Sequence, residues 1–379
     1  MSDSPHIVLI GAGFAALAAA RALRRLRPHA RIRLIAPTRH FVYRPSLIWV
    51  PIGLRKASQI EVPLAPFLAK HAMYFTPATV TGIVDRGRTV LTSLGPVRND
   101  ALIVATGASF GSGLDGAGHA LSLCEGVGSA ERVRARLLAM QGGRIAIGCG
   151  ENPHQAGATR CGPMLELLFG IDTWLRRRGK RAQFALSFFS TCGEPFESFG
   201  KRAAERLQAE LDRRDIESSV GLALRGFSPT AMLTEGGSIA AEMIVFTPGL
   251  SGPSWLAESE LPRSSGGFVA ADDHCAVSGL DLVFAAGDVG SFPGPAWSPK
   301  LAHMAHMQAS VAAANLDAAL NEKPQTSRLH HELACVIDTL DGGFILYRDE
   351  AHAIASPPAM PLHWAKRTVE RRYLSSMHA

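Results

Sequence analysis

The chain begins with an alternation of short apolar runs and a longer stretch of helical character. Residues 6–10 form a short run rich in β-branched residues and leucine, and residues 31–35 form a second such run. Between them, residues 17–26 have the alanine, leucine and arginine content of a helix. A strand, a glycine turn, a helix and a strand within about 30 residues predict a βαβ unit that binds a nucleotide at its first turn.

The turn after the first run contains Gly11, Gly13, Phe14 and Ala16 in a Gly-x-Gly-x-x-Ala pattern. Gly11 allows a tight turn, Gly13 lets the backbone approach a pyrophosphate, and Ala16 lets the helix pack closely on the strands. The helix N-terminus would then face the phosphates, although a packing turn without a ligand is the alternative. Residues 36–38 read Ala-Pro-Thr where an acidic residue commonly holds a ribose hydroxyl, so we expect adenosine recognition to differ in detail.

Two later apolar runs end in turns that fit the same kind of ligand. One run ends in Thr106 and Gly107, and another ends in Gly287 and Asp288. A carboxylate at a strand end can accept hydrogen bonds from ribose-like hydroxyls, although an Asp that only caps the next element is the alternative. Both segments resemble landmarks of the FAD-dependent pyridine nucleotide-disulfide reductase superfamily, in which the second lies on the flavin ribitol. The resemblance implies FAD as the cofactor and a FAD domain split in sequence.

The middle of the chain begins as a second nucleotide-binding unit would. Residues 143–150 form an apolar run that ends in Gly-Cys-Gly. The loop that follows lacks the glycine spacing of a dinucleotide turn, and Pro153 would displace the backbone amides that hold a pyrophosphate. NADH binding in this half is therefore not favoured. A helix is expected after Pro163.

Length and composition set the broad class. The chain has 379 residues, 47% of them apolar and 19% charged, which favours two interleaved domains and a smaller tail. The formal net charge of +6 suits an anionic substrate, a phosphate-bearing cofactor or an acidic lipid surface, and no nucleic-acid-binding motif accompanies it. Residues 1–6 lack a basic start, and no apolar stretch reaches the roughly 18 residues that span a bilayer. We therefore expect a cytoplasmic protein, attached at most peripherally to the inner face of the cell membrane.

Several segments resemble the sulfide:quinone oxidoreductases and together span nearly the whole chain. Residues 148–166 contain a Gly-rich strand end, a Gln-Ala segment, and a Cys followed by Gly-Pro and Glu, as in that family. The other matching segments are 41–53 with Pro45, 121–125 with Cys124, 294–300 with Pro299 and Lys300, 334–343 with Cys335, and 363–370.

This resemblance assigns chemistry to the cysteines. It implies that Cys161 and Cys335 meet at the flavin, where sulfide opens a disulfide or polysulfide bridge by thiol exchange. Cys335 would be the thiolate nearest the flavin, through which two electrons pass, while sulfur accumulates on Cys161. Cys124 is either a sulfur relay, as in the family, or a small buried residue. The remaining cysteines match no role, and we interpret them as buried or incidental thiols: Cys149, Cys192 and Cys275.

Two charged residues are candidates for supporting roles. Lys300 precedes a helix expected at 301–316 and could stabilise negative charge on reduced flavin, or it is a solvated lysine. Glu166 could move protons for the cysteines, or it is a surface or helix-dipole carboxylate. His303 and His306 share a helical face, but no Cys or carboxylate at ligand spacing accompanies them, so no metal site is expected.

The chain departs from the family at two histidines that are linked with proton handling. Gly128 stands shortly after the first cysteine where the family has one, and Ser198 replaces the other. These losses leave room for a non-catalytic FAD protein that senses redox state or sulfur. A further alternative is NAD(P)H:quinone reduction, as in type II NADH dehydrogenases, which share the FAD framework.

The last stretch of the chain predicts an amphipathic helix. Its apolar positions are Leu362, Ala365, Val369 and Tyr373, and its cations are Lys366, Arg367, Arg371 and Arg372. The pattern suits an anionic membrane interface, and a helix packed on the body of the protein would show the same pattern.

Together these features predict an α/β protein with two Rossmann-like dinucleotide-binding domains of the glutathione-reductase type. We expect the FAD domain at 1–110 and 241–320, the second domain at 111–240, and a C-terminal region at 321–379. The expected function is FAD-dependent oxidation of sulfide, or a related sulfur species, with electron transfer to a quinone. A homo-oligomer is compatible with the sequence.

Overall fold

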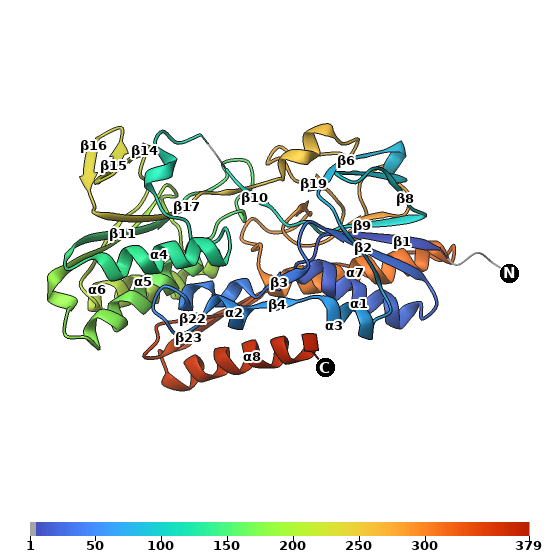
Figure 1. Ribbon diagram of the computed structural model, residues 1–379. Helices are drawn as coiled ribbons and strands as arrows, with labels where there is room; N and C mark the ends of the chain where they lie inside the picture. The colour runs from blue at the N-terminus through green and yellow to red at the C-terminus, as the bar shows by residue number, and fades with distance from the viewer. Residues whose placement is uncertain (1–4, 112, 379) are drawn as a thin grey trace.

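The protein consists of two halves that lie side by side, each built around a parallel sheet, with the last helix beneath both (Figure 1). This computed structural model describes residues 5–111 and 113–378. Residues 1–4, which belong to the segment without a basic start, lie outside the described residues.

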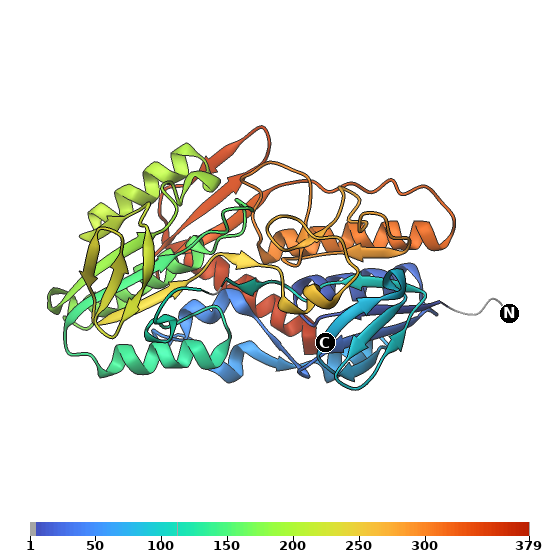
Figure 2. The same ribbon diagram turned by 90° about the horizontal axis from the view of Figure 1, so that it is seen from above.

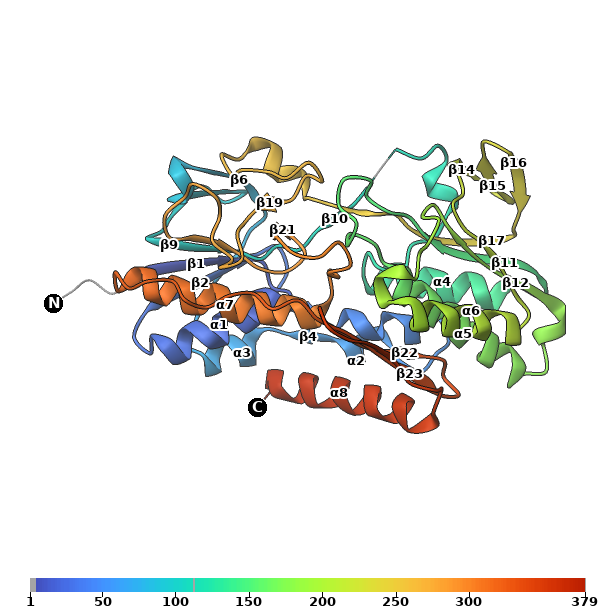
Figure 3. The same ribbon diagram turned by 180° about the vertical axis from the view of Figure 1, so that it is seen from behind.

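The first half contains the predicted βαβ unit inside a five-stranded parallel sheet. Its strands lie in the order β20-β9-β1-β2-β5, with β1 at His6–Ile10, β2 at Arg31–Ala36, β5 at Tyr74–Pro77, β9 at Ala101–Val104 and β20 at Val283–Ala285. Because β20 pairs with β9 in parallel, this half is split in sequence, as predicted. Helices α1 (Phe14–Leu26) and α7 (Ala302–Leu320) lie against each other through buried alanines on one side of the sheet (Figure 3).

The second half contains a four-stranded parallel sheet. Its strands lie in the order β13-β12-β11-β17, with β11 at Gly143–Cys149, β12 at Phe184–Ser190, β13 at Ile216–Ser219 and β17 at Met243–Thr247. The accompanying helices are α4 (Val127–Ala139), α5 (Cys161–Arg176) and α6 (Lys201–Arg213). The pairing of β17 with β11 extends this sheet beyond residue 240, where we expected the second domain to end.

Smaller antiparallel elements complete both halves. Strands β10 (Ser109–Phe110) and β18 (Leu250–Ser251) pair with each other where the chain crosses between the halves (Figure 2). The remaining elements are β3 (His40–Val42), β4 (Glu61–Pro63), β6 (Val80–Val84), β7 (Thr89–Thr92), β8 (Val97–Arg98), β14 (Leu224–Ser228), β15 (Ala231–Thr234), β16 (Gly237–Ala240), β19 (Val269–Ala270), β21 (Gly290–Ser291), α2 (Ala57–Ile60), α3 (Ala65–Lys70) and the 3-10 turn η1 (Arg44–Trp49).

The C-terminal region packs on both halves. Strands β22 (Leu333–Asp338), β23 (Gly343–Arg348) and β24 (Ala353–Ala355) form an antiparallel sheet, and α8 (Met360–His378) contacts β22, β23 and α3. The face of α8 that turns inward only partly matches the apolar face expected from the sequence, since Tyr373 packs inward as expected but two of the other positions do not. Ala365 and Val369 are exposed, whereas the inward positions are His363, Lys366, Glu370, Tyr373 and Met377. Polar residues of α8 can turn inward because buried carboxylates and an indole on neighbouring elements are their partners. The spacing of apolar residues along the sequence does not reveal such pairs.

Candidate active site at the facing sheet edges

The glycine turn predicted for a nucleotide lies at the carboxyl end of β1. Gly11 has a φ of 116°, and a Cβ there would lie 2.2 Å from the carbonyl oxygen of Ala105. Only glycine fits this position, because the turn after β1 touches the end of the neighbouring strand β9. Gly13 is the N-cap of α1, and a Cβ there would have no atom of the described residues within 4 Å. There is therefore open space beside Gly13 at the start of α1.

The other residues predicted to hold the cofactor gather at this sheet edge. Thr106 and Gly107 follow β9, and Gly287 and Asp288 follow β20, which are parallel neighbours in the same sheet. Gly287 has a φ of 80°, and a Cβ there would lie 2.9 Å from the Ala15 Cβ, so glycine lets α1 come close. The remaining predicted residues nearby are Phe14 and Ala16 in α1 and Pro45 in η1.

This edge fits FAD. The open space at the N-terminus of α1 can receive a pyrophosphate, because backbone N–H groups and the helix dipole favour negative charge there. The carboxylate of Asp288 lies on the same edge and can accept hydrogen bonds from ribitol hydroxyls. Bound FAD would supply a two-electron acceptor that can pass the electrons on to a further acceptor.

Lys300 binds the loop that follows β20 through hydrogen bonds. Its ammonium donates to the carbonyl oxygen of Asp288 at 3.0 Å and to that of Gly290 at 2.5 Å, and it lies 4.0 Å from the Phe268 ring centroid. Burial lowers the pKa of Lys300 to about 8. Pro299 directly precedes it, before α7 begins at Ala302. The lysine is thus not a solvated side chain at a helix start.

Arg160, which sequence reasoning did not single out, connects the two halves. It lies in the loop before α5, its guanidinium pairs with the Asp288 carboxylate, and it also donates to the Lys300 carbonyl oxygen. The start of α5 therefore lies next to the edge of the first sheet that fits FAD. No spacing rule could have found this residue, because the contact depends on how the halves pack.

The cysteine at the start of α5 is in a disulfide, and its partner differs from the expected one. Cys161 is bonded to Cys149, the last residue of β11, with their Cα atoms 5.2 Å apart. Within the described residues Cys335 keeps a free thiol. The pairing of Cys161 with Cys335 is therefore wrong for this structure, as is the interpretation of Cys149 as an incidental thiol. The physical reason is local, because the loop between β11 and α5 folds back and brings strand end and helix start together.

Cys124 lies beside the same strand ends. Cys149 is in register with Thr247 of β17, and the Thr247 hydroxyl donates to the Cys124 sulfur at 3.8 Å and to the Met164 sulfur of α5 at 3.4 Å. The carbonyl of Cys124 accepts a hydrogen bond from Arg44 at 2.6 Å. Burial raises the pKa of the Cys124 thiol. Cys124 is thus a partly buried thiol near the Cys149–Cys161 disulfide.

Cys335 lies on the strand that packs against the first turn of α5. Side chains two apart in a strand share a face, so Cys335 points to the same side of β22 as Ile337. A Cβ at Gly162, next to Cys161, would lie 3.7 Å from the Ile337 side chain. Burial and the nearby Glu166 carboxylate raise the pKa of Cys335 to about 12, while Lys366 acts in the opposite direction.

Glu166 is buried in α5 next to this thiol. It forms an ion pair with Lys366 of α8 and accepts a hydrogen bond from the backbone N–H of Asp338 at 2.9 Å. Burial raises the pKa of Glu166 to about 7, with Lys366 partly opposing the shift. A carboxyl group with this pKa can take up and release a proton near neutral pH. The alternative of a surface carboxylate is therefore wrong.

Asp338 extends this polar cluster. Its carboxylate contacts His363 Nδ1 at 2.9 Å and accepts a hydrogen bond from the Trp49 indole at 2.6 Å. Burial alone would raise the pKa of Asp338, but His363, Lys366 and Trp49 together lower it. Asp338 and His363 both have side chains at most 5% exposed. The polar cluster of Glu166, Asp338, His363 and Lys366 thus lies behind Cys335 on the side of α8.

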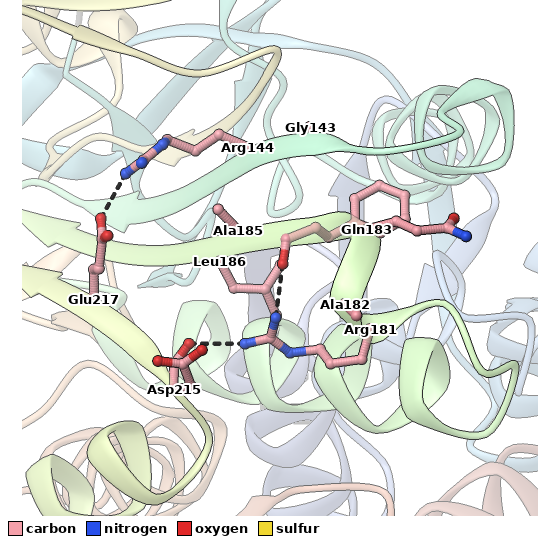
Figure 4. A pocket seen from close by; sticks show the side chains of 10 residues that line it. Gly143, Arg144, Arg181, Ala182, Gln183, Ala185, Leu186, Asp215 and Glu217 are labelled. Carbon is pink, nitrogen blue, oxygen red and sulfur yellow. Dashed lines mark hydrogen bonds and ion pairs between the residues drawn. The ribbon is translucent and has the colours of Figure 1, made fainter.

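A surface pocket elsewhere in the second half does not belong to this site. It lies at the amino ends of β11 and β12, lined by Arg144, Arg181, Asp215 and Glu217 among others (Figure 4). The Arg144 guanidinium is paired with Glu217 at 2.5 Å, and Arg181 donates to backbone carbonyls. The length of β11 separates this pocket from Cys149 by about 20 Å at the rise of a β-strand.

The chain is similar to known proteins both in sequence and in structure. The sulfide-quinone reductase of Aquifex aeolicus is 26% identical over 364 residues, covering 89% of this chain and 82% of that protein. An NADH dehydrogenase-like protein of Mycobacterium tuberculosis is 27% identical over 304 residues, covering 75% of this chain and 72% of that protein. The crystal structure of the Aquifex aeolicus sulfide:quinone oxidoreductase matches with a TM-score of 0.88 and 22% identity, covering 99% of this chain and 92% of that one.

The structural match confirms the predicted α/β fold with Rossmann-like domains. A model of the pyridine nucleotide-disulphide oxidoreductase family matches residues 5–309, which is most of the chain. The protein therefore belongs to the pyridine nucleotide-disulphide oxidoreductase family and is an FAD-dependent oxidoreductase.

Proposed function

We propose that this flavoenzyme oxidises sulfide, or a related small sulfur compound, and passes two electrons to a quinone. The observation that carries the proposal is the position of Cys335 on β22, the strand whose Ile337 packs against Gly162, next to Cys161. Glu166 and Lys366 form an ion pair that affects the pKa of the Cys335 thiol, and Lys366 also donates to the carbonyl oxygen of the adjacent Val336, so we assign them as its proton acceptor and its cation. The similarity to the Aquifex aeolicus sulfide-quinone reductase supports the same substrates.

The cysteines carry the sulfur in this proposal. Sulfide attacks a disulfide or polysulfide that involves Cys161, which leaves a persulfide on one sulfur and a thiolate on the other. Sulfur accumulates on Cys161, and Cys335 is the thiolate through which the electrons leave. Glu166 accepts the Cys335 proton, and Lys366 stabilises the negative charge that remains. We assign Cys124, which contacts the Thr247 that is in register with Cys149, as a relay for the released sulfur.

The cofactor-binding roles follow the positions of the residues at the first sheet edge. We assign the pyrophosphate to the turn with Gly11 and Gly13, and the ribitol to Asp288. Thr106, Gly107 and Gly287 line the neighbouring strand ends, while Phe14, Ala16 and Pro45 shape the surroundings. Lys300, next to Pro299, supplies positive charge near the flavin.

The outer side of α8 is the proposed contact with an anionic membrane, from which a quinone would come. Trp364 and Val369 are 56% and 60% exposed, and Arg371 and Arg372 are exposed beside them. Among residues 5–111 and 113–378, no helix combines the length and the apolar character needed to cross a bilayer. An interfacial helix with apolar and cationic positions fits peripheral attachment.

NADH is the donor to test against sulfide, because one relative is an NADH dehydrogenase-like protein. The segment after β11 opposes NADH binding. It contains Pro153 in place of a glycine turn, and its ends are joined by the Cys149–Cys161 disulfide. A pyrophosphate would lack the short turn that directs backbone amides toward it.

Anaerobic stopped-flow mixing of the FAD-loaded enzyme tests the proposal directly. Sulfide should bleach the flavin absorbance rapidly, and NADH should do so far more slowly. Cys335→Ser should abolish bleaching by sulfide, whereas Cys275→Ala, a buried thiol in the first half, should keep it. Bleaching by NADH alone would replace this function with NADH oxidation, and bleaching by neither would indicate a non-catalytic FAD protein.

A further inference from the structure

We propose that Cys149 is a further redox-active cysteine, which holds Cys161 in a resting disulfide and is the leaving group when Cys335 attacks Cys161. This inference rests on the proposed function and adds a residue to it. In the resting protein the electrophile is then the Cys149–Cys161 bond, and Cys335 waits as a thiol. The bridge between Cys161 and Cys335 forms only after exchange.

The surroundings of Cys149 support a thiolate at this position. The hydroxyl oxygen of Ser190 lies 3.8 Å from the Cys149 sulfur, and the two residues are in register at the ends of β12 and β11. That oxygen already accepts a hydrogen bond from the backbone N–H of Cys192 at 3.0 Å, so its own proton is available to the sulfur. A hydrogen bond to the charged form stabilises a departing thiolate.

The position of Cys161 makes it the sulfur that changes partner. It is the first residue of α5, and its sulfur lies 3.1 Å from the Thr159 hydroxyl. The first turn of α5 is bonded to β11 through the disulfide. It also packs against β22, where Gly162 lies near Ile337. Cys161 thus lies between Cys149 and the strand that carries Cys335.

The exchange step balances without an external oxidant or reductant. Cys335 loses its proton to Glu166, and the thiolate attacks the Cys161 sulfur in line with the existing bond. A bond forms between Cys335 and Cys161, the bond between Cys161 and Cys149 breaks, and the electron pair stays on Cys149. The number of disulfides is unchanged, and the new bridge is the one that sulfide opens.

A disulfide that only braces the fold would behave differently. Both cysteines are buried, with Cys149 0% and Cys161 2% exposed, so a bracing bond would survive turnover. The proposed exchange is reversible, and sulfide draws it forward because it consumes the Cys161–Cys335 bridge. The Cys149–Cys161 bond therefore opens when sulfide turns over, and it opens only if Cys335 is present. This difference makes the proposal testable by the state of Cys149.

The experiment maps the cysteines of the FAD-loaded enzyme before and after one equivalent of sulfide. Samples are quenched in acid, alkylated and analysed as peptides without reduction, while the flavin absorbance is recorded in the same mixture. In the resting enzyme we expect Cys149 linked to Cys161. After sulfide we expect Cys149 alkylated and Cys161 linked to Cys335 directly or through added sulfur. Cys335→Ser should keep the Cys149–Cys161 link intact under the same treatment.

Two variants of Cys149 and one control variant show whether a changed map of the cysteines comes from the loss of Cys149 or from a loss of the fold. Cys149→Ser and Cys149→Ala should leave Cys161 free or linked to Cys335 in the resting enzyme, and Cys275→Ala should give the wild-type map. Flavin bleaching with an intact Cys149–Cys161 link overturns this inference and leaves the proposed function standing. A resting enzyme without that link, or a link that opens equally in Cys335→Ser, also overturns the inference. Absence of bleaching in the wild type overturns the proposed function, and the inference with it.

Discussion

At the scale of single residues, Glu166 sets the expected pH dependence. Burial raises the pKa of its carboxyl to about 7, and only the ionised form can accept a proton from Cys335. Below this pKa the protonated fraction dominates, so the rate of flavin reduction by sulfide should rise as the pH increases. Above it the rate should level off. Glu166→Gln should lower the rate about 10²-fold and remove this inflection.

The ionisation of sulfide itself falls in a similar pH range, so the informative quantity is the difference between two profiles. Wild type and Glu166→Gln are compared by stopped flow at equal concentrations of hydrosulfide anion. Glu235→Gln, which changes an exposed carboxylate in the second half, serves as the control and should keep the wild-type profile. Equal profiles for wild type and Glu166→Gln would remove Glu166 from the mechanism.

Gly11 allows a second test at this scale. Gly11→Ala should destabilise the fold strongly and prevent retention of FAD, because a Cβ would meet the Ala105 carbonyl oxygen at 2.2 Å as well as requiring a φ of 116°. Gly95→Ala is a matched control, since Gly95 has a φ of 107° and no atom of the described residues within 4 Å of its Cβ. It should cost only the backbone strain, about 1–2 kcal/mol. Thermal unfolding and bound flavin per chain measure both effects, and equal losses in the two variants would contradict the steric argument.

The sequence alone predicts the position of some residues of the candidate site but not of others. The positions of Gly11 and Asp288 after β1 and β20 were predictable because they depend on the local order of strand, turn and helix, which a short segment encodes. The disulfide partner of Cys161 was not predictable. The choice between Cys149 and Cys335 depends on how the loop between β11 and α5 folds back on β11. The two cysteines stand at a strand end and a helix start of one unit, which is the signal that could have found the bridge.

At the scale of elements, the polar inner face of α8 depends on paired charges. Glu370 is 2% exposed and is held by Arg55, which donates to both carboxylate oxygens and lies 5.2 Å from the Trp49 ring. Arg55→Ala would leave a buried carboxylate without its cation, so we expect a loss of about 3–5 kcal/mol in the free energy of unfolding. Arg225→Ala breaks the exposed Arg225–Glu235 pair and should cost at most about 1 kcal/mol. Urea unfolding compares the two, and similar losses would show that α8 does not depend on this pair.

Elements were predictable where packing follows apolar pattern. The strands and the helix of the first βαβ unit were predictable from the sequence, because their buried sides form a continuous apolar surface. The orientation of α8 was not, because His363 and Glu370 turn inward to meet Asp338 and Arg55 while Val369 turns outward. Buried ion pairs reverse the usual relation between polarity and exposure, and only the partner elements reveal them.

At the scale of the whole molecule, α8 holds the two halves and the C-terminal sheet together. Its first part carries His363 and Lys366 toward β22, and its last part places the Tyr373 ring 5.1 Å from that of Phe14 in the first half. The polar cluster behind Cys335 and the aromatic contacts of α1 are thus attached to one helix.

The final prediction is that the outer side of α8 binds an anionic lipid surface. Arg371 and Arg372 flank the exposed Trp364 and Val369, and each cation near such a surface contributes about 1 kcal/mol. The double variant Arg371→Gln/Arg372→Gln should therefore lose about 2 kcal/mol, roughly 30-fold in affinity, for vesicles of phosphatidylcholine with phosphatidylglycerol. Flotation or Trp fluorescence measures the binding, which should weaken at higher salt because the attraction is screened.

The control for this prediction is Arg225→Gln, which removes an exposed cation from β14 in the second half and should bind as the wild type does. Trp364→Ser should weaken binding at every salt concentration, because it removes apolar burial and leaves the charges in place. Equal binding to vesicles without anionic lipid would contradict an electrostatic contact, and unchanged binding in all three variants would place the membrane contact elsewhere. If the prediction holds, the helix that positions Lys366 beside Glu166 is also the helix that rests on the membrane, so lipid binding should change the pH profile of sulfide oxidation set by Glu166.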